Sequence, residues 1–217
     1  MNTEYNKKYL QGAWILGIAF LSLLTILHLI KPELDPTWHL ISEYEIGKYG
    51  WLMRLAFFCW GGGFILLTIS LWSLLDSLSG KIGKWWLLII SFALFGAGIF
   101  ATQPITDIIR GTIDRLHAVC GAIMIFTFPI ASTIIAKSLS KHSSIRSAKY
   151  TLIAVTFLVW FGLIAFFSSM IIYGQQIKLR AYSDSILIGV PNRFMVLTYT
   201  IWLITIARLL NTHKQSI

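Results

Sequence analysis

The chain has 217 residues, of which 56% are hydrophobic and 12% charged, and its formal net charge at pH 7 is +9. This composition leaves little of the chain for a soluble domain. The basic residues are scattered at the borders of apolar stretches instead of forming one patch, which argues against nucleic-acid binding.

Six apolar stretches follow one another along the chain, and each approaches the ~20 residues that cross the ~30 Å hydrocarbon core of a bilayer as a helix. Because hydrocarbon offers a backbone amide no hydrogen-bond partner, continuous apolar runs of this length indicate helices. The stretches are 13–30, 52–75, 85–101, 117–136, 151–173 and 194–210. Their connections are short, so we expect one domain over 1–217. The sequence therefore predicts an all-α membrane protein, a single six-transmembrane-helix bundle.

The first stretch follows two lysines, as the apolar part of a signal peptide would. It is too long for the apolar region of a signal peptide, however, and is followed by Lys31-Pro32-Glu33 with no small-residue cleavage site. We therefore expect it to be a retained first span.

The alternate gaps between the stretches differ in charge. With the N-terminus placed inside, ten basic residues and two acids fall on the inner side, against eight basic residues and seven acids on the outer side. The connection 137–150 holds four basic residues and no acid. Because cytoplasmic loops carry an excess of Lys and Arg, we expect both termini in the cytoplasm and insertion in the inner (plasma) membrane, with membrane lipids as partners. The outer acids are Glu33, Asp35, Glu43, Glu45, Asp107, Asp114 and Asp184.

The first outer connection, 31–51, mixes four Trp and Tyr residues with charges. An aromatic belt at the level of the lipid headgroups explains this composition without a ligand. A connection of this length also often carries function. Within it, Ser42-Glu43-Tyr44 places a carboxylate between two hydroxyl groups near the membrane edge, and these three are candidate ligand-binding residues.

The second outer connection has the pattern of a helix start at Gln103-Pro104-Ile105-Thr106-Asp107, with Thr or Asp as N-cap and a carboxylate near the positive end of the helix dipole. If this helix continues into the fourth stretch, four polar residues lie within an arc of about 80° on one face, because each residue turns the helix by 100°. They are Asp107, Arg110, Asp114 and His117. Surface salt bridges of about 0.2–0.5 kcal/mol each explain the pattern. An ionisable residue that enters a span is equally a functional candidate, and His117 is the deepest of the four.

Two arginines begin spans on the same side. Arg193 follows Pro191-Asn192 at the last stretch, and Arg54 begins the second. Each could be an anchor whose charged head reaches the interface. With the acids of that side, Arg193 could also hold an anionic or zwitterionic headgroup through a bidentate contact.

Neither the histidines nor the cysteines show the spacing of a metal site. His28, His39 and His117 could share a metal, but no HxxxH or HExxH pattern occurs, so no cofactor is assigned. Cys59 and Cys120 both fall in the outer turns of their spans. A disulfide is conceivable, but two free thiols that pack as small apolar groups are favoured.

Small residues and one proline inside the spans indicate how the helices pack. Gly61-Gly62-Gly63 marks a flexible or a closely packed point of the second span. Pro129 should bend the fourth span.

Several short motifs resemble those of the domain of unknown function 998 family. They are Ser42-Glu43-Tyr44, Pro104-x-Thr106-Asp107, His117 and Asn192-Arg193, in the same order over essentially the whole chain. The family typically has Phe-Pro-Thr-Asp, where this chain has one residue more between Pro104 and Thr106. The resemblance implies a six-span prokaryotic membrane protein without an established activity, and an outer cluster of Glu43, Asp107, His117 and Arg193.

Three functions remain open on the sequence. The favoured one is a protein that binds or senses a lipid headgroup or small polar ligand in an outer-facing polar pocket. Its candidate residues are Ser42, Glu43, Tyr44, Asp107, Arg110, Asp114, His117 and Arg193. The second is a metal-dependent hydrolase of a lipid ester or amide, in which Asp107, Asp114 and His117, possibly with Ser42, bind a metal that activates water. The third is a secondary transporter, which is disfavoured because no inverted repeat, pair of broken helices or mid-span charge is evident.

Overall fold

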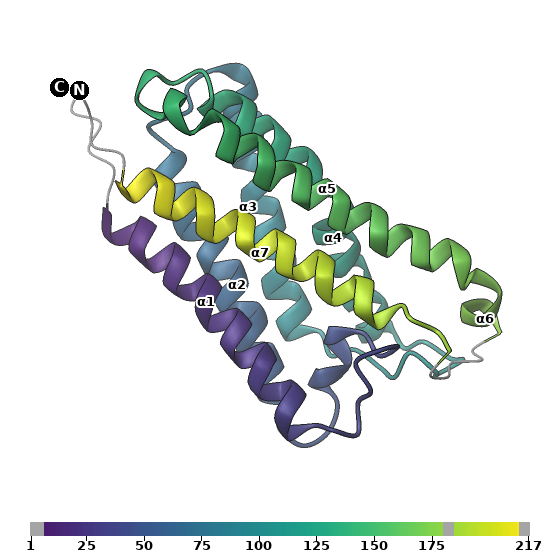
Figure 1. Cartoon of the computed structure of the whole chain (residues 1–217). Helices are drawn as coiled ribbons and strands as arrows, with labels where there is room; N and C mark the ends of the chain where they lie inside the picture. Colours follow the sequence, from purple (N-terminus) through teal and green to yellow (C-terminus); the bar gives the residue numbers. More distant parts are fainter. Residues whose placement is uncertain (1–6, 180–184, 213–217) are drawn as a thin grey trace.

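The computed structural model describes residues 7–179 and 185–212. Four charged residues of the comparison above, Glu4, Arg180, Asp184 and Lys214, lie outside this part. Within it every regular element is helical, and six helices are long and apolar enough to cross a membrane, which confirms the predicted all-α membrane class (Figure 1). The elements are α1 Lys7–Ile30, the 3-10 helix η1 Ile41–Glu45, α2 Gly50–Leu71, α3 Leu78–Ile99, α4 Thr112–Leu139, the 3-10 helix η2 Ser143–Ala148, α5 Lys149–Ile172, α6 Gly174–Lys178 and α7 Gly189–Thr212.

The helices differ in their bounds from the apolar stretches. The third helix begins at Leu78, seven residues before the apolar stretch, because the Ser77 hydroxyl caps it by accepting a hydrogen bond from the Gly80 amide at 3.1 Å. The second helix ends at Leu71, four residues before its stretch does. Apolar composition marks the part of a helix that lies in hydrocarbon, whereas hydrogen-bonding groups decide where the helix begins and ends.

The six long helices form a bundle whose neighbours differ in how closely they pack. In sequence around the bundle, α4 packs on α3, α3 on α2, α2 on α1, α1 on α7, and α7 on α5. The remaining pair, α4 and α5, has fewer residues in close approach than any of these neighbouring pairs. This looser seam between α4 and α5 is the feature of the fold that matters most for the site.

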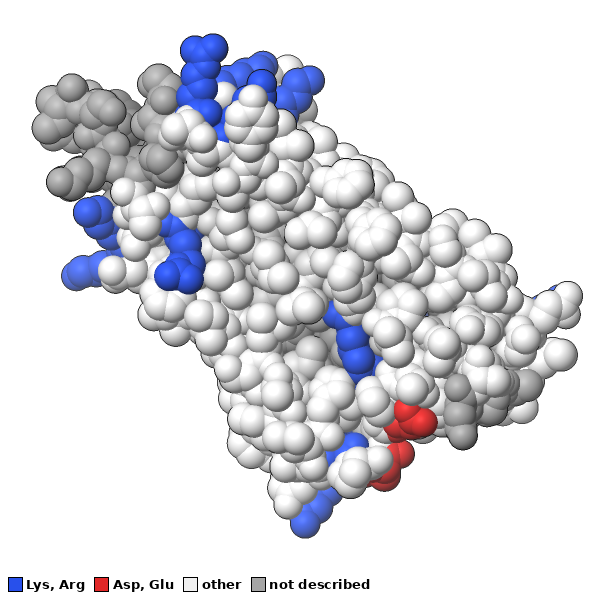
Figure 2. Space-filling view, in the orientation of Figure 1, with Lys and Arg blue, Asp and Glu red and all other residues white. Residues whose placement is uncertain are grey.

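The two ends of the bundle carry different charges. In Figure 2, Lys and Arg side chains gather at the end where α1 begins and α7 ends, and the acidic side chains in view lie at the opposite end. That opposite end carries η1 and the segment 100–111 and is called here the η1 end. The separation of charges between the two ends agrees with the alternation of charges in the sequence.

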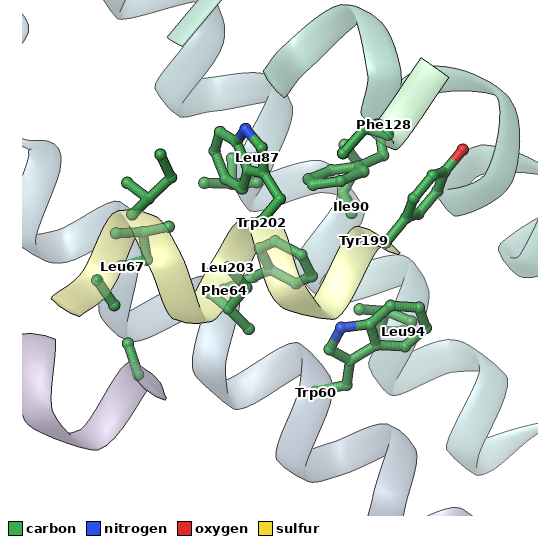
Figure 3. Packing of buried hydrophobic residues seen from close by; sticks show 14 of the residues in the cluster. Trp60, Phe64, Leu67, Leu87, Ile90, Leu94, Phe128, Tyr199, Trp202 and Leu203 are labelled. Atoms are coloured by element: carbon green, nitrogen blue, oxygen red, sulfur yellow. The ribbon is translucent and has the colours of Figure 1, made fainter. Parts of the chain in front are cut away.

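Aromatic side chains fill the middle of the bundle (Figure 3). The ring of Phe128 in α4 lies 5.1 Å from that of Phe64, 4.7 Å from that of Tyr199 and 5.3 Å from that of Trp202. Trp202 donates its indole N–H to the Thr156 hydroxyl of α5 at 3.2 Å. Such contacts matter because helices in a bilayer associate through packing and interhelical hydrogen bonds, not through water exclusion.

The glycine run of α2 serves close packing. A β-carbon on Gly61 would stand 3.0 Å from the Ser91 carbonyl oxygen of α3, and one on Gly63 would stand 3.1 Å from the Ala13 carbonyl oxygen of α1. Of the two alternatives that the sequence left open, close approach of helix backbones is the one observed.

Pro129 lies inside α4 and removes one backbone donor. A proline has no N–H, so the carbonyl four residues earlier, that of Ile125, loses its helical partner. The Tyr199 hydroxyl of α7 donates to that carbonyl oxygen at 2.8 Å. Tyr199, 70 residues away in the sequence, thus supplies the hydrogen bond that Pro129 cannot donate.

Candidate functional site

A cavity of about 440 Å³ lies in the half of the bundle nearest the η1 end. Its walls come from α2, α3, α4, α5 and α7 and are apolar over most of their depth. Leu94, Ala97, Met124, Phe166 and Met195 belong to these walls. Its ceiling is formed by η1 and the segment 100–111, where the polar candidates are concentrated. A volume of this size is in the range of sites for small molecules.

Three side chains hold η1 over the cavity. The Asn192 side-chain oxygen, from the first turn of α7, accepts a hydrogen bond from the Ile41 amide at 3.1 Å. Glu43 accepts from the Leu40 amide at 2.9 Å, which caps the first turn of η1. At the other end, the buried Lys31 ammonium donates to the carbonyl oxygens that end η1. This short helix is therefore anchored to α7 and to the residue that directly follows α1.

Asp114 fastens the segment 100–111 to the start of α4. Its Oδ1 accepts from the Gln103 amide at 2.8 Å, from the Thr102 hydroxyl at 3.2 Å and from Arg110 at 3.0 Å. The same guanidinium group donates to the carbonyl oxygens of Gln103 and Ile105. Among the described residues, no group donates to the second oxygen, Oδ2. Asp114 is 5% exposed and lines the cavity.

His117 lies one turn deeper on α4, and one of its two ring nitrogens is hydrogen-bonded to the backbone. Its Nδ1 lies 2.8 Å from the Phe100 carbonyl oxygen and 3.0 Å from that of Ala97. Carbonyl oxygens only accept hydrogen bonds, so Nδ1 must carry a proton and Nε2 is the nitrogen left with a lone pair when the ring is neutral. His117 lines the cavity, and no described residue makes a hydrogen bond with its Nε2.

Two buried carboxyl groups of η1 differ in their surroundings. Burial raises the pKa of Glu45 to about 7, against the opposing effects of the Thr102 amide and of Arg54. Its Oε2 lies 3.5 Å from His117 Nδ1, while Oε1 has no hydrogen-bond partner among the described residues. Burial also raises the pKa of Glu43, although the Ile105 and Leu40 amides counter it. The ceiling thus holds two carboxyl groups that are easier to protonate than exposed ones.

Arg193 belongs to a separate cluster beside the cavity. Its Nε donates to His28 Nε2 at 2.7 Å, and its two terminal nitrogens donate to the carbonyl oxygens of His39 at 2.6 Å and Gly189 at 3.0 Å and to the Tyr44 hydroxyl at 3.3 Å. Four of the five N–H groups of this guanidinium are therefore occupied. The cluster joins α1, α7 and the segment 31–49, and neither Arg193 nor Tyr44 lines the cavity.

The prediction that a helix begins near Asp107 is wrong. Residues 101–111 are not helical, and α4 begins at Thr112. The tertiary bonds that Asp114 and Arg110 make to Gln103 compete successfully with helical hydrogen bonding here. As a result Asp107 does not share a helix face with the other three candidates, and its carboxyl group makes no hydrogen bond or ion pair with a described residue.

The candidates predicted from the sequence therefore divide into three groups. Five line the cavity, two belong to the Arg193 cluster, and Asp107 lies apart from both. The five are Ser42, Glu43, Arg110, Asp114 and His117. Whether any of them binds a ligand stays a prediction.

Sequence reasoning overlooked several residues that build or line the cavity. In the sequence Asn192 stands out only as the neighbour of Arg193, yet it holds η1 and lines the cavity. Arg115 lines the cavity as well, and Trp60 lines it with an indole N–H that is buried and has no acceptor among the described residues. Arg115 is followed by small residues at 118 and 122, and this spacing along one helix face is the signal that could have drawn attention to it.

Metal and thiol chemistry receive no positive support. Among the described residues no three His, Cys, Asp or Glu side chains are grouped so that they could hold a metal ion. Cys59 and Cys120 are free thiols, the favoured alternative. A β-carbon on Gly96 would stand 2.5 Å from the Cys120 sulfur, so this thiol packs as a small apolar group against α3.

Comparison with known proteins identifies the family and nothing finer. Neither the curated proteins nor the solved structures include a match to this chain. One family model matches residues 15–209, which cover the six long helices except for the first eight residues of α1 and the last three of α7. The resemblance inferred from the short motifs is thereby confirmed, and the chain belongs to the family described as Protein of unknown function (DUF998).

Proposed function

We propose that this protein binds a lipid headgroup or small polar ligand in the cavity at the η1 end. We place this end at the outer face of the inner (plasma) membrane, with both termini in the cytoplasm, because the opposite end carries the excess of basic residues. The surrounding membrane lipids are then its immediate partners.

The observation that carries the proposal is a cavity with apolar walls and unsatisfied polar groups. Asp114 Oδ2, His117 Nε2 and the Ser42 hydroxyl make no hydrogen bond with a described residue, although all three side chains line the cavity. Buried polar groups in proteins are nearly always hydrogen-bonded, and the buried Trp60 indole N–H, which lines the same cavity, has no acceptor among the described residues. A polar ligand or ordered water would supply the missing partners, and a few convergent polar groups in an apolar cavity are typical of small-molecule sites.

The proposed experiment removes one free group at a time. Ser42→Ala deletes a hydroxyl that bonds no described residue. His117→Asn keeps an amide donor near the position of Nδ1 and removes Nε2. The matched control is Thr106→Ala, which deletes an exposed hydroxyl outside the cavity. Each full-length protein is purified in mild detergent, and native mass spectrometry measures what it retains.

The proposal expects a bound molecule on the wild type that both cavity variants lose and the control keeps. Wild type without any bound molecule, or a bound molecule that both variants retain, would contradict it. Elemental analysis of the same samples tests the hydrolase hypothesis, which requires a stoichiometric metal that His117→Asn weakens. The transporter hypothesis has no observation of this structure in its favour.

A further inference from the structure

We propose that the ligand is a phospholipid of the leaflet at the η1 end, which reaches the cavity sideways between α4 and α5. One acyl chain lies inside the cavity, and the phosphate group is held by Arg115 at the top of the gap. This inference rests on the proposed function and names the class of ligand and its route.

The cavity reaches the lipid-facing surface of the bundle along the α4–α5 seam. Ala118 and Ala122 both line the cavity and are exposed. A β-carbon on Gly121, which lies between them on the cavity side, would meet no atom within 4 Å. Because Ala118 and Ala122 both line the cavity and are exposed, they mark an opening between the cavity and the outer surface. This opening is kept by small residues on two adjacent turns of α4.

The seam is closed below the opening. The rings of Phe126 in α4 and Phe167 in α5 meet edge to face at 6.2 Å, and two turns further on Trp160 donates to the Thr133 hydroxyl at 2.9 Å. Phe126 lies about 20 Å below the start of α4 at 1.5 Å per residue. Because a bilayer core is about 30 Å thick, the opening spans the leaflet at the η1 end and stops near the middle of the membrane.

The interior suits a hydrocarbon chain better than a water-filled site. Its lower walls are formed by Leu94, Met124, Phe166, Met195 and other apolar side chains. An apolar cavity that is continuous with hydrocarbon is filled by hydrocarbon at little cost, since no apolar surface has to leave or enter water. A wholly polar ligand would leave these walls without matching contacts.

The charge at the top of the opening suits a phosphate group. Arg115, Ala118, Ala122 and Phe126 fall within an arc of about 80° on one face of α4 at 100° per residue. Arg115 is exposed and lines the cavity, and it forms no ion pair with a described carboxylate. Arg110, by contrast, is paired with Asp114 at 3.0 Å. A guanidinium group that is free at headgroup level can bind phosphate oxygens in a bidentate manner.

The experiment uses two photoactivatable probes that share one acyl chain. The first is a monoacyl phosphatidylglycerol with a diazirine on its chain, and the second is the monoacylglycerol that lacks the phosphate. The full-length protein is labelled in maltoside micelles, which bring no competing phosphate. Mass spectrometry then assigns the labelled residues to the buried walls, such as Met124 and Met195, or to the lipid-facing surface, such as Val119 and Ile164.

Two pairs of variants separate the route from the headgroup contact. Ala122→Trp fills the opening from an exposed position, whereas Val119→Trp places the same bulk at a 56% exposed position outside the cavity. Arg115→Gln removes the free guanidinium, whereas Arg54→Gln removes an exposed one in the second turn of α2, away from the cavity. Elution of each variant as a single peak on size exclusion establishes that it is folded.

We expect the phosphate probe to label Met124 and Met195 in wild type and in both controls. Ala122→Trp should lower this labelling by about tenfold or more, which corresponds to about 1.4 kcal/mol of binding. Arg115→Gln should lower it to the level of the phosphate-free probe.

Three results would overturn the inference while the proposed function stands. The first is labelling confined to lipid-facing residues and equal in all variants. The second is equal labelling of the walls by the two probes in wild type. The third is full competition by free glycerol phosphate, which would identify a headgroup-sized ligand that arrives from water. Failure of the proposed function itself would appear elsewhere, as wild type that retains no molecule in native mass spectrometry.

Discussion

The pairing of Pro129 with Tyr199 makes a quantitative prediction about stability. Tyr199→Phe keeps the ring that packs 4.7 Å from Phe128 and removes only the hydroxyl that bonds the Ile125 carbonyl oxygen. Interhelical hydrogen bonds in membrane proteins contribute about 0.6 kcal/mol on average and up to about 1.7. The Ile125 carbonyl has lost its helical donor, so the upper part of this range applies. We expect Tyr199→Phe to cost about 1–2 kcal/mol.

Tyr199→Phe should lower the free energy of unfolding much less when residue 129 carries a backbone N–H. Pro129→Ala supplies the missing donor four residues after Ile125, so the hydroxyl is no longer required there. The double-mutant cycle should therefore show a coupling of about 1 kcal/mol. Free energies come from reversible unfolding by SDS in mixed micelles, followed by circular dichroism.

The control for this cycle is Thr200→Val. The buried Thr200 hydroxyl donates to the Val196 carbonyl oxygen at 2.8 Å within α7, so its loss should cost the same with Pro129 or Ala at position 129. If Tyr199→Phe also costs the same in both backgrounds within about 0.3–0.5 kcal/mol, the ordinary limit of additivity, the proposed sharing of one carbonyl is refuted.

Three further predictions concern the ceiling and the Arg193 cluster. The pKa of Glu45 rises from 4.5 to about 7 on folding, so the folded state binds more protons than the unfolded state between pH 4.5 and pH 7, and the free energy of unfolding falls as pH rises through this range. Glu45→Gln should therefore be more stable than wild type at pH 8, by up to about 3 kcal/mol, and about as stable as wild type at pH 4. A difference that is independent of pH in thermal unfolding would contradict this. Asp114→Asn should speed hydrogen exchange across 100–111, at the Gln103 amide above all, and leave α1 unchanged; equal protection in both proteins would count against the anchoring role. Arg193→Lys should cost about 1–3 kcal/mol in SDS unfolding, since one ammonium group cannot replace four directed N–H bonds, whereas Arg54→Lys should cost nothing measurable.

The class of the protein could be predicted from the sequence because the physics behind it is local. A run of about 20 apolar residues satisfies its own backbone only as a helix, whatever its neighbours are. The alternation of charges between the connections is likewise visible without a fold. Short polar motifs such as Ser42-Glu43-Tyr44 and Asn192-Arg193 then sufficed to identify the family.

The candidate site could be predicted only in part, because it depends on contacts between distant segments. Sequence reasoning extended the fourth helix back to Asp107, since local capping signals favour it. The bonds from Asp114 to Thr102 and Gln103 hold that segment in another conformation. Arg193 is a candidate ligand for anions on the sequence, and the structure adds what the sequence did not show, that neighbours from α1 and the segment 31–49 accept hydrogen bonds from its guanidinium group.

Tertiary structure alone decided where the bundle is open. The α4–α5 seam, the empty space beside Gly121 and the sharing of one carbonyl by Pro129 and Tyr199 all depend on how whole helices are placed. Hydropathy and motif spacing describe one helix at a time, whereas a cavity is the space that several helices leave unfilled. For that reason the helices and the family follow from the amino-acid sequence alone, whereas the packing of the helices decides which polar residues share a cavity.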